Sequence, residues 1–306
     1  MISVVICTHN ARVGHLTRVI DALKLQTLST QQWELLVVDN ASTPPVEPLL
    51  DLRWHPCARI VREETLGLTY ARLRGIKEMK GTLVLFVDDD NVLDSNYLEN
   101  LADLAAKRPY IAAFGANVSG EFESSPPPWY DGLLGWLAIV KTKRDIWGNS
   151  YNLEQLPVGA GLCVRRDVAD AYTTALASSP IRLSLDRCGS SLTSGGDTDI
   201  VLTAIDMGFG AGVFTSLHLT HLIPSERLTK KYLLQLAEAM AFSKELRGRI
   251  GRGPLDPEPG WRRRLLDLFK RPLVSSFERK MLDARHRGKA RAARELSNSG
   301  FRSQHN

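Results

Sequence analysis

Residues 83–90 constrain the fold more than any other stretch, because a run of five apolar residues stops at three consecutive aspartates. The apolar run is typical of a strand buried on both faces. In an open α/β sheet, ligands bind just beyond the carboxyl ends of the strands, where Asp88, Asp89 and Asp90 fall. Adjacent carboxylates repel one another unless a cation lies among them, and oxygen ligands favour Mg²⁺ or Mn²⁺. The stretch predicts a metal-dependent nucleotide site; the alternative is a solvated acidic turn that caps the next helix.

Strand and helix patterns alternate along the first third of the chain. Strand patterns lie at 2–6, 33–38 and 59–61, and helix patterns lie at 13–25 and 68–79. Polar residues follow the strand patterns, which predicts a mostly parallel, nucleotide-binding sheet of the α/β class. No Gly-x-Gly-x-x-Gly turn follows the first strand, and the loop there carries Thr8 and Asn10 instead. We therefore expect a metal at the aspartates, rather than a glycine cradle, to neutralise the phosphates.

The positive charge is concentrated in the C-terminal part. The chain has a formal net charge of +5, but residues 252–306 contain 14 Lys/Arg and 6 Asp/Glu, so the first 251 residues have a net charge of −3. Because a nucleic-acid-binding body would carry a basic patch, we expect no nucleic-acid partner. The strand pattern at 2–6 leaves no room for a secretory signal, so we expect a cytoplasmic protein. The four cysteines are widely spaced and are expected to be buried thiols.

The sequence predicts one large domain with a C-terminal appendage. Residues 1–247 would form the domain, with a donor half at about 1–118 and an acceptor half at about 119–247. Residues 248–260, rich in Gly and Pro, would be a linker before a basic tail at 261–306, helical or partly disordered. The tail has two interpretations. In one, the tail is a peripheral helix on the inner face of the plasma membrane, and Trp261, Leu265, Leu268 and Phe269 insert into the bilayer surface. In the other, the tail is a solvated helix packed against the body.

The middle of the chain contains two segments with open alternatives. The stiff, proline-rich stretch 123–128 precedes Trp129, Tyr130 and Trp136, which would either stack on a sugar or anchor the loop to the body. Residues 157–166 are rich in small side chains. They would either let the backbone approach a ligand closely or form a bulged strand.

Two further stretches carry candidate site residues. Glycines precede Asp197 and Asp199, which open a helical pattern and would act in catalysis or as helix caps. His218 and His221 lie three residues apart in a strand pattern. Because side chains alternate between the faces of a strand, at most one of these histidines can be a ligand.

Taken together, these motifs resemble a family 2 glycosyltransferase with the GT-A fold, a Rossmann-like mixed sheet flanked by helices. The resemblance covers roughly the first 230 residues and five motifs in the family's order. The motifs lie at residues 4–10, 37–42, 67–72, 86–90 (the Asp-x-Asp motif) and 194–199. The segments 195–200 and 220–229 resemble those of bacterial members linked to exported polysaccharide.

The resemblance implies a role for each matched residue. Thr8 and Asp39 would contact the nucleobase, with Asp39 accepting from a uracil-type imide. Asn10 and Arg72 would lie near the nucleotide. Asp88 and Asp89 would contact the ribose and the metal. Asp90 would bind the metal directly, with His221 as the second ligand. Asp197 would be the catalytic base. Many relatives have Glu-Asp where this chain has Gly196 and Asp197, which leaves Asp199 as an alternative base.

The implied activity is an inverting, single-displacement transfer that depends on Mn²⁺ or Mg²⁺. The donor would be a nucleotide-diphosphate sugar, expected to be a UDP-sugar, and the acceptor a hydroxyl of a saccharide or lipid-linked saccharide. The Gln-x-x-Arg-Trp signature of processive synthases is absent, which favours a single addition. The alternative is a non-catalytic nucleotide-sugar-binding protein of a membrane polysaccharide assembly. A nucleotidyltransferase would need a glycine-rich basic loop after the first strand, which is missing.

Overall fold

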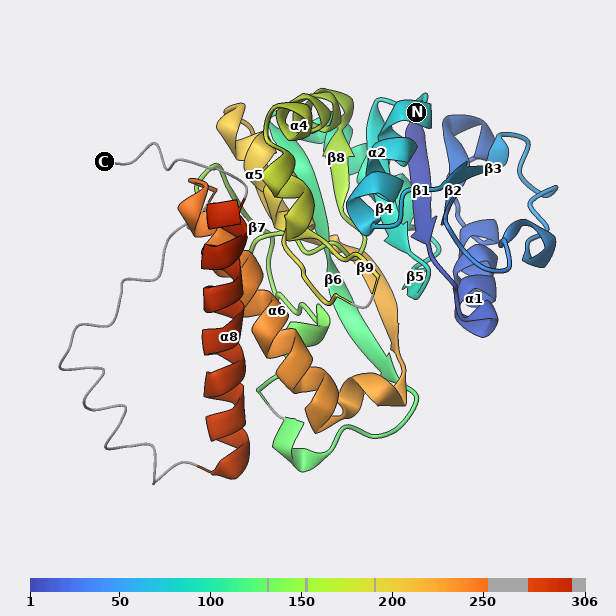
Figure 1. The fold of residues 1–306 in the computed structure, drawn as a ribbon. Helices are drawn as coiled ribbons and strands as arrows, with labels where there is room; N and C mark the ends of the chain where they lie inside the picture. Colours follow the sequence, from blue (N-terminus) through green and yellow to red (C-terminus); the bar gives the residue numbers. More distant parts are fainter. Residues whose placement is uncertain (131, 152–153, 190, 253–274, 299–306) are drawn as a thin grey trace.

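The structure is a computed structural model of the 306-residue chain, and it describes residues 1–130, 132–151, 154–189, 191–252 and 275–298 (Figure 1). The strands are β1 (Ile2–Thr8), β2 (Trp33–Asn40), β3 (Ala58–Glu63), β4 (Leu83–Asp88), β5 (Asn91–Leu93), β6 (Ile111–Phe122), β7 (Ile146–Gly148), β8 (Cys163–Arg165) and β9 (Gly210–Ile223). The α-helices are α1 (Val13–Lys24), α2 (Leu68–Glu78), α3 (Tyr97–Lys107), α4 (Arg166–Ser178), α5 (Gly196–Asp206), α6 (Lys230–Arg249) and α8 (Ser276–Asn298). The predicted α/β class is confirmed.

The strands form one sheet whose first half follows the predicted pattern. The order is β3-β2-β1-β4-β8-β6-β9-β5, with β7 paired to β9, and β3, β2, β1 and β4 are mutually parallel. Successive side chains of β1 point to opposite faces, so Val4 and Ile6 join one core while Val5 joins the other. Helices α1 and α3 cover the first face, and α2, α4 and α5 cover the second. This packing aligns the ends of β1 and β4.

The second half of the sheet is mixed, so the mixed sheet that the resemblance implied is confirmed, whereas the mostly parallel sheet expected from the strand and helix pattern holds only for the first half. β8 runs antiparallel between β4 and β6, and β5 and β7 run antiparallel to β9. Parallel neighbours need a long crossover connection, usually a helix. The described residues between β6 and β8 form only short 3-10 turns and β7, so that connection is missing there.

Helices α6 and α8 lie side by side at one edge of the molecule (Figure 1). They approach closely at Gly288, where an added Cβ would overlap the backbone carbonyl of Glu238. The face of α8 that points inward is buried at Met281, Ala284, Ala292 and Leu296. For residues 276–298 the structure therefore agrees with a tail helix packed against the body. The four side chains proposed for membrane insertion lie outside the described residues.

Two sequence expectations about the chain as a whole have different outcomes. None of the helices in the described ranges combines the length and the apolar character needed to cross a bilayer. All four cysteines are unpaired, and Cys7 and Cys163 are buried as expected. Cys57 and Cys188 are exposed, contrary to the expectation, because both lie in surface loops rather than in strands.

Candidate active site

A cavity of about 840 Å³ lies at the carboxyl ends of β1 and β4. It is lined by these strand ends, the start of α2, residues 158–160, the start of α5, and parts of β9, α6 and α8. The lining includes seven of the nine predicted site residues: Thr8, Arg72, Asp88, Asp89, Asp90, Asp197 and His221. Asn10 and Asp39 do not line it. The sheet therefore gathers residues that are up to 213 positions apart in the sequence, from Thr8 to His221.

The pKa values of the three aspartates at the end of β4 are shifted in different directions. Burial and the neighbouring Asp90 raise the pKa of Asp89 to about 7, and the same two causes raise the pKa of Asp88. Burial would also raise the pKa of Asp90, but the positive charge of Arg227, which donates to this carboxylate, acts in the opposite direction and the pKa is lowered. Thr8 Oγ1 donates to Asp89 Oδ2 at 2.5 Å, because β1 and β4 are neighbours in register. A cation at this corner would relieve the repulsion among the carboxylates.

Asp90 and His221 meet because β5 pairs with β9. This pairing places Asn91 opposite His221, and Leu222 N donates to the carbonyl of Asp90. The distance from His221 Nε2 to Asp90 Oδ2 is 3.3 Å. His218 lies on the other face and contacts Ser119. As expected, only one of the two histidines reaches the site.

The hydrogen bonds of His221 leave one ring nitrogen as an acceptor. His221 Nδ1 lies 2.9 Å from the carbonyl oxygen of Leu137, which assigns the proton to Nδ1. Nε2 then accepts from Arg227 Nη1 at 2.9 Å, and Arg227 Nη2 donates to Asp90 Oδ2 at 3.0 Å. A carboxylate oxygen and an imidazole nitrogen thus converge on one positive group.

The Asp90 carboxylate oxygen and His221 Nε2 could both bind a divalent ion such as Mn²⁺, which accepts carboxylate and imidazole ligands. The described residues contain no cluster of three or more His, Cys, Asp or Glu side chains suited to a metal ion. An ion held by Asp90 and His221 would therefore take its other ligands from water or from the phosphates of a substrate. It would also replace the two hydrogen bonds from Arg227.

Asp197 and Asp199, although two residues apart, have different environments. Asp197 is half-buried, lines the cavity, and accepts from Gly159 N at 2.8 Å and from Thr198 N at 2.7 Å. Asp199 is fully buried between two guanidinium groups, with Nε of Arg182 at 2.7 Å and Nε of Arg252 at 2.8 Å. Only Asp197 can face a substrate. The small residues at 157–162 form a loop rather than a bulged strand, and the loop's backbone holds this carboxylate.

A carboxylate from another segment lies beside the residue that precedes Asp197. Asp186 lies against Gly196, where an added Cβ would overlap its carboxylate. The same carboxylate accepts from Arg72 Nη1 at 2.8 Å, and both side chains are buried. Arg72 also stacks over the ring of Phe86. This ion pair lies beside the residues that precede Asp197, and both of its side chains are shielded from solvent.

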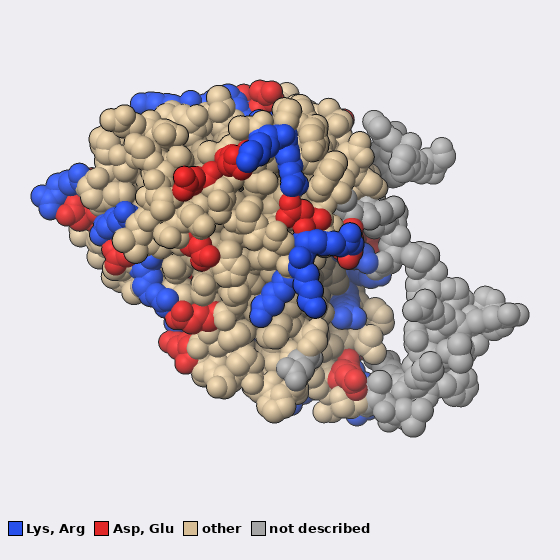
Figure 2. All heavy atoms as spheres, turned by 180° about the vertical axis from the view of Figure 1, so that it is seen from behind, with Lys and Arg blue, Asp and Glu red and all other residues tan. Residues whose placement is uncertain are grey.

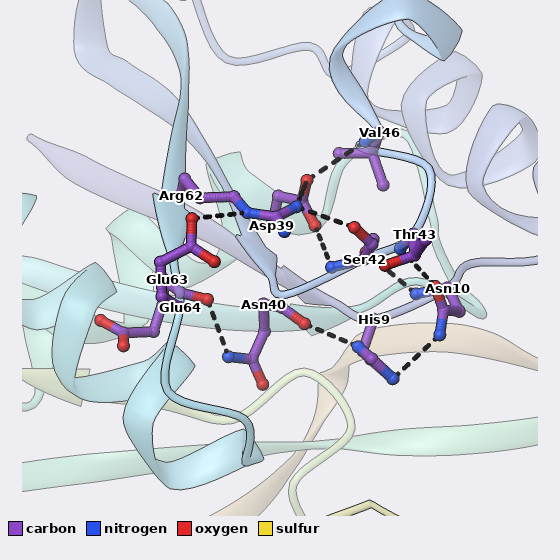
Figure 3. Close-up of polar contacts among 10 residues, drawn as sticks. All are labelled: His9, Asn10, Asp39, Asn40, Ser42, Thr43, Val46, Arg62, Glu63 and Glu64. Atoms are coloured by element: carbon purple, nitrogen blue, oxygen red, sulfur yellow. Dashed lines mark hydrogen bonds and ion pairs between the residues drawn. The ribbon is translucent and has the colours of Figure 1, made fainter.

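Asp39 fixes the loop after β2 (Figure 3). Its carboxylate accepts from Ser42 N, Val46 N and Arg62 Nη1, and only 2% of the residue is exposed. Burial would raise the pKa of Asp39, but these hydrogen bonds outweigh it and keep the pKa low. The residue is therefore a buried anchor next to the cavity, and its contact with a nucleobase remains a prediction.

Asn10 ties the loop after β1 to the loop after β2. Its side-chain oxygen accepts from Thr43 N at 2.8 Å, and its backbone N–H donates to Ser42 Oγ at 3.0 Å (Figure 3). Nearby, His9 Nδ1 lies 2.6 Å from the carbonyl oxygen of Asn40. His9 and Asn40 line the cavity, whereas Asn10 supports it from outside.

Of the three aromatic residues near the proline-rich stretch, Trp136 alone lines the cavity. Tyr130 is fully buried and donates its hydroxyl to the carbonyl oxygen of Arg227 at 3.0 Å. Trp129 packs its ring against Phe277 of α8. Trp129 and Tyr130 therefore anchor the loop, while Trp136 is placed to contact a ligand.

Sequence reasoning missed several residues of the site. Arg227 lies in the motif at 220–229, and that motif was a usable signal for it. Asp186 gave no local signal, because its function depends on a glycine ten residues later in the chain. Lys244, Arg247, Arg285 and Lys289 also line the cavity. They were not predicted, because α6 and α8 were assigned to separate units of the chain.

Comparisons with known proteins identify the family and the fold of the chain. The model of the family described as Glycosyl transferase family 2 matches residues 3–170. The glucosyl-dolichyl phosphate glucuronosyltransferase of Haloferax volcanii is 22% identical over 173 residues, which are 55% of this chain and 53% of that protein. The chain thus spans about half the length of this curated relative.

Two solved structures share the fold at low identity, and their match confirms the GT-A architecture. S. aureus TarS 1–349 in complex with UDP is 16% identical and has a TM-score of 0.52, with 98% of this chain and 92% of that chain covered. The mannosyltransferase PcManGT from Pyrobaculum calidifontis, in complex with GDP-Man and Mn²⁺, is also 16% identical and has a TM-score of 0.52. That match covers 98% of this chain and 74% of the other.

Proposed function

The chain belongs to glycosyl transferase family 2, and on this premise we propose that it is an inverting, metal-dependent glycosyltransferase. It moves a sugar from a nucleotide-diphosphate donor to a hydroxyl of a saccharide or lipid-linked saccharide. Asp197 is the general base. The observation that carries the proposal is that Asp197 and the Asp88–Asp90 corner line one cavity.

Asp197 suits the role of a base because hydrogen bonds hold its carboxylate, and it forms no ion pair with any residue in the described part of the chain. The backbone N–H groups of Gly159 and Thr198 fix its orientation. It accepts the proton of the acceptor hydroxyl while that oxygen attacks the anomeric carbon from the face opposite the leaving group. One displacement of this kind inverts the configuration.

The reaction also requires that the leaving diphosphate be stabilised, and the residues at the end of β4 would do this. Asp90 and His221 would hold Mn²⁺ or Mg²⁺, which when bound neutralises negative charge on the phosphates. Arg227 is placed to donate to the same phosphates once its bonds to Asp90 and His221 are released. Thr8 keeps Asp89 in place through its hydroxyl.

The similar proteins support this choice of substrates. TarS is known in complex with UDP, and PcManGT in complex with GDP-Man and Mn²⁺. The name of the Haloferax relative describes a lipid-linked sugar, glucosyl-dolichyl phosphate. We propose a UDP-sugar as the donor, with GDP-sugars as the alternative that the experiment must separate.

A thermal-stabilisation screen tests the donor. The protein is heated with UDP, GDP or CDP, each with and without Mn²⁺, because a ligand at 100 times its Kd stabilises the folded state by about 2.7 kcal/mol. We expect UDP with Mn²⁺ to raise the melting temperature most. No shift with any diphosphate would reject the proposal. Binding without transfer to any acceptor would favour the alternative, a nucleotide-sugar-binding protein without catalysis.

A further inference from the structure

We propose that the acceptor carries an anionic group, a phosphate or diphosphate, which binds the basic wall of the cavity. The basic wall consists of Lys244 and Arg247 of α6 and Arg285 and Lys289 of α8. This inference rests on the proposed function and names the chemical class of its second substrate.

The charged groups that line the cavity differ between its sides. Away from α6 and α8 the lining has five carboxylates and three guanidinium groups, those of Asp88, Asp89, Asp90, Asp186 and Asp197 and of Arg72, Arg187 and Arg227. The lining residues of α6 and α8 include four cations and no carboxylate, and the others are Tyr232, Leu236, Ala237, Met240 and Ala241. Elsewhere, on the face seen in Figure 2, basic and acidic side chains are interspersed. A wall of one sign inside a cavity concentrates ligands of the opposite sign.

Arg247 has a buried N–H group, that of Nε, that lacks a hydrogen-bond acceptor among the described residues. Burial lowers the pKa of its guanidinium, an effect that Asp197 and Asp199 only partly offset. Leaving such a donor unpaired is costly, and a bound anion would satisfy it with a charge-assisted hydrogen bond.

The basic wall is attached to the segment that presents the base. An added Cβ on Gly195, two residues before Asp197, would lie 3.4 Å from Arg247 Nε. Arg291 of α8 donates to Thr193 Oγ1 at 3.2 Å, and Ser194 N donates to Ser243 Oγ at 3.1 Å. An anion on the wall would therefore lie beside the group that deprotonates the acceptor, which favours an acceptor site over a second donor site.

The apolar part of the wall suits a phosphate that carries a hydrocarbon chain. Leu236, Ala237 and Met240 precede the cations along α6. Arg285 lies over the ring of Trp136, with its guanidinium carbon 5.4 Å from the ring centroid. The stacking holds the cation at the cavity surface. A lipid-linked phosphate and a soluble sugar phosphate would both bind the cations through the phosphate. Only the lipid-linked phosphate would also contact these apolar residues.

The test uses the full-length protein saturated with UDP and Mn²⁺, so that the diphosphate site is already filled. Octyl phosphate, below its micelle concentration, is titrated by calorimetry, with octyl glucoside as the uncharged amphiphile and inorganic phosphate as the anion without a chain. We expect octyl phosphate to bind and octyl glucoside to bind at least tenfold more weakly. The Arg285→Gln variant should lose about tenfold in affinity for octyl phosphate, and Arg247→Gln should behave alike if it folds. The matched control is Arg287→Gln, since Arg287 is on the same helix but pairs with Glu238 outside the cavity.

Three outcomes would overturn the inference: octyl phosphate binds only when UDP is absent, octyl glucoside binds equally well, or Arg285→Gln binds octyl phosphate like the control. Inorganic phosphate that binds as tightly as octyl phosphate supports a soluble phosphorylated acceptor, and weaker binding of inorganic phosphate supports a lipid-linked one. If UDP itself does not bind, the proposal of a UDP-sugar donor is rejected. The same titration of the protein without UDP still tests whether the basic wall binds a phosphate.

Discussion

The carboxylate of Asp186 occupies the space that a side chain at Gly196 would need. The chain therefore places a carboxylate beside the residue that precedes Asp197, the proposed base. Asp186 neutralises Arg72, and Arg72 Nη2 would lie 3.1 Å from a Cβ added to Gly159, the residue whose N–H holds Asp197. Asp186, Arg72, Gly159 and Asp197 form one connected group.

This relationship predicts that positions 186 and 196 are coupled in stability. Gly196→Ala should destabilise the protein by about 1–3 kcal/mol because its Cβ overlaps a buried carboxylate. In an Asp186→Ala background the same change should cost less, with a coupling of about 0.5–3 kcal/mol in a urea double-mutant cycle. Gly14→Ala is the control, since nothing lies within 4 Å of its added Cβ. Additive costs at 186 and 196 would contradict the overlap.

Asp197→Asn should abolish transfer while Mn²⁺-dependent nucleotide binding persists. Loss of a general base typically lowers the rate by about 10²–10⁴. Gly159 N and Thr198 N donate to different oxygens of Asp197, so the amide oxygen keeps one of these two hydrogen bonds. Turnover and UDP binding are measured on the same preparation. Asp199→Asn serves as the contrast, since it leaves Arg182 and Arg252 without their buried partner. It should cost about 3–5 kcal/mol of stability. Near-normal turnover of Asp197→Asn would reject it as the base.

His221→Ala should weaken Mn²⁺-dependent UDP binding by about tenfold or more, because one of two protein ligands is lost. Asp90→Ala should act in the same direction, and EDTA should reduce the binding of wild type to the level of both variants. His218→Ala is a matched control on the same strand, since His218 faces Ser119 and not the cavity. Calorimetric titration of UDP at fixed Mn²⁺ measures the effect, and equal curves for His221→Ala and His218→Ala would count against the metal assignment.

Glu34→Gln should make the protein less sensitive to acid. Burial would raise the pKa of Glu34, but hydrogen bonds from Ser3, Lys80 N and Arg59 outweigh it and depress the pKa. A depressed pKa in the folded state stabilises the protein above the ordinary value of 4.5, and this contribution is lost as the pH falls below it. The variant should be about 2 kcal/mol less stable at pH 7, with the difference shrinking toward pH 3. Urea unfolding across this range measures it, and a constant difference would contradict the linkage.

The sequence predicted the first half of the fold because that half depends on local patterns, and seven of the nine residues selected from motifs line one cavity. The run that ends at Asp88 identified β4 and its acids, and the spacing of His218 and His221 showed that only one could be a ligand.

What could not be predicted depends on contacts between distant segments. The choice between Asp197 and Asp199 required the positions of Arg182 and Arg252, one on each side of Asp199 in the chain. Asp39 matched a nucleobase-binding motif, yet its carboxylate is occupied by donors that include Arg62, 23 residues later. The basic wall required α8 to fold back on α6, and the closeness of that packing depends on one glycine, Gly288.

The pairing of Asn91 with His221 means that the number of residues in β9 decides whether His221 points toward Asp90. Because side chains alternate along a strand, deleting one residue of β9 just before His221 would turn the imidazole away from Asp90 without changing any residue of the site. Insertions and deletions in this strand are therefore expected to inactivate the enzyme even where the fold survives, whereas conservative replacements in it are tolerated.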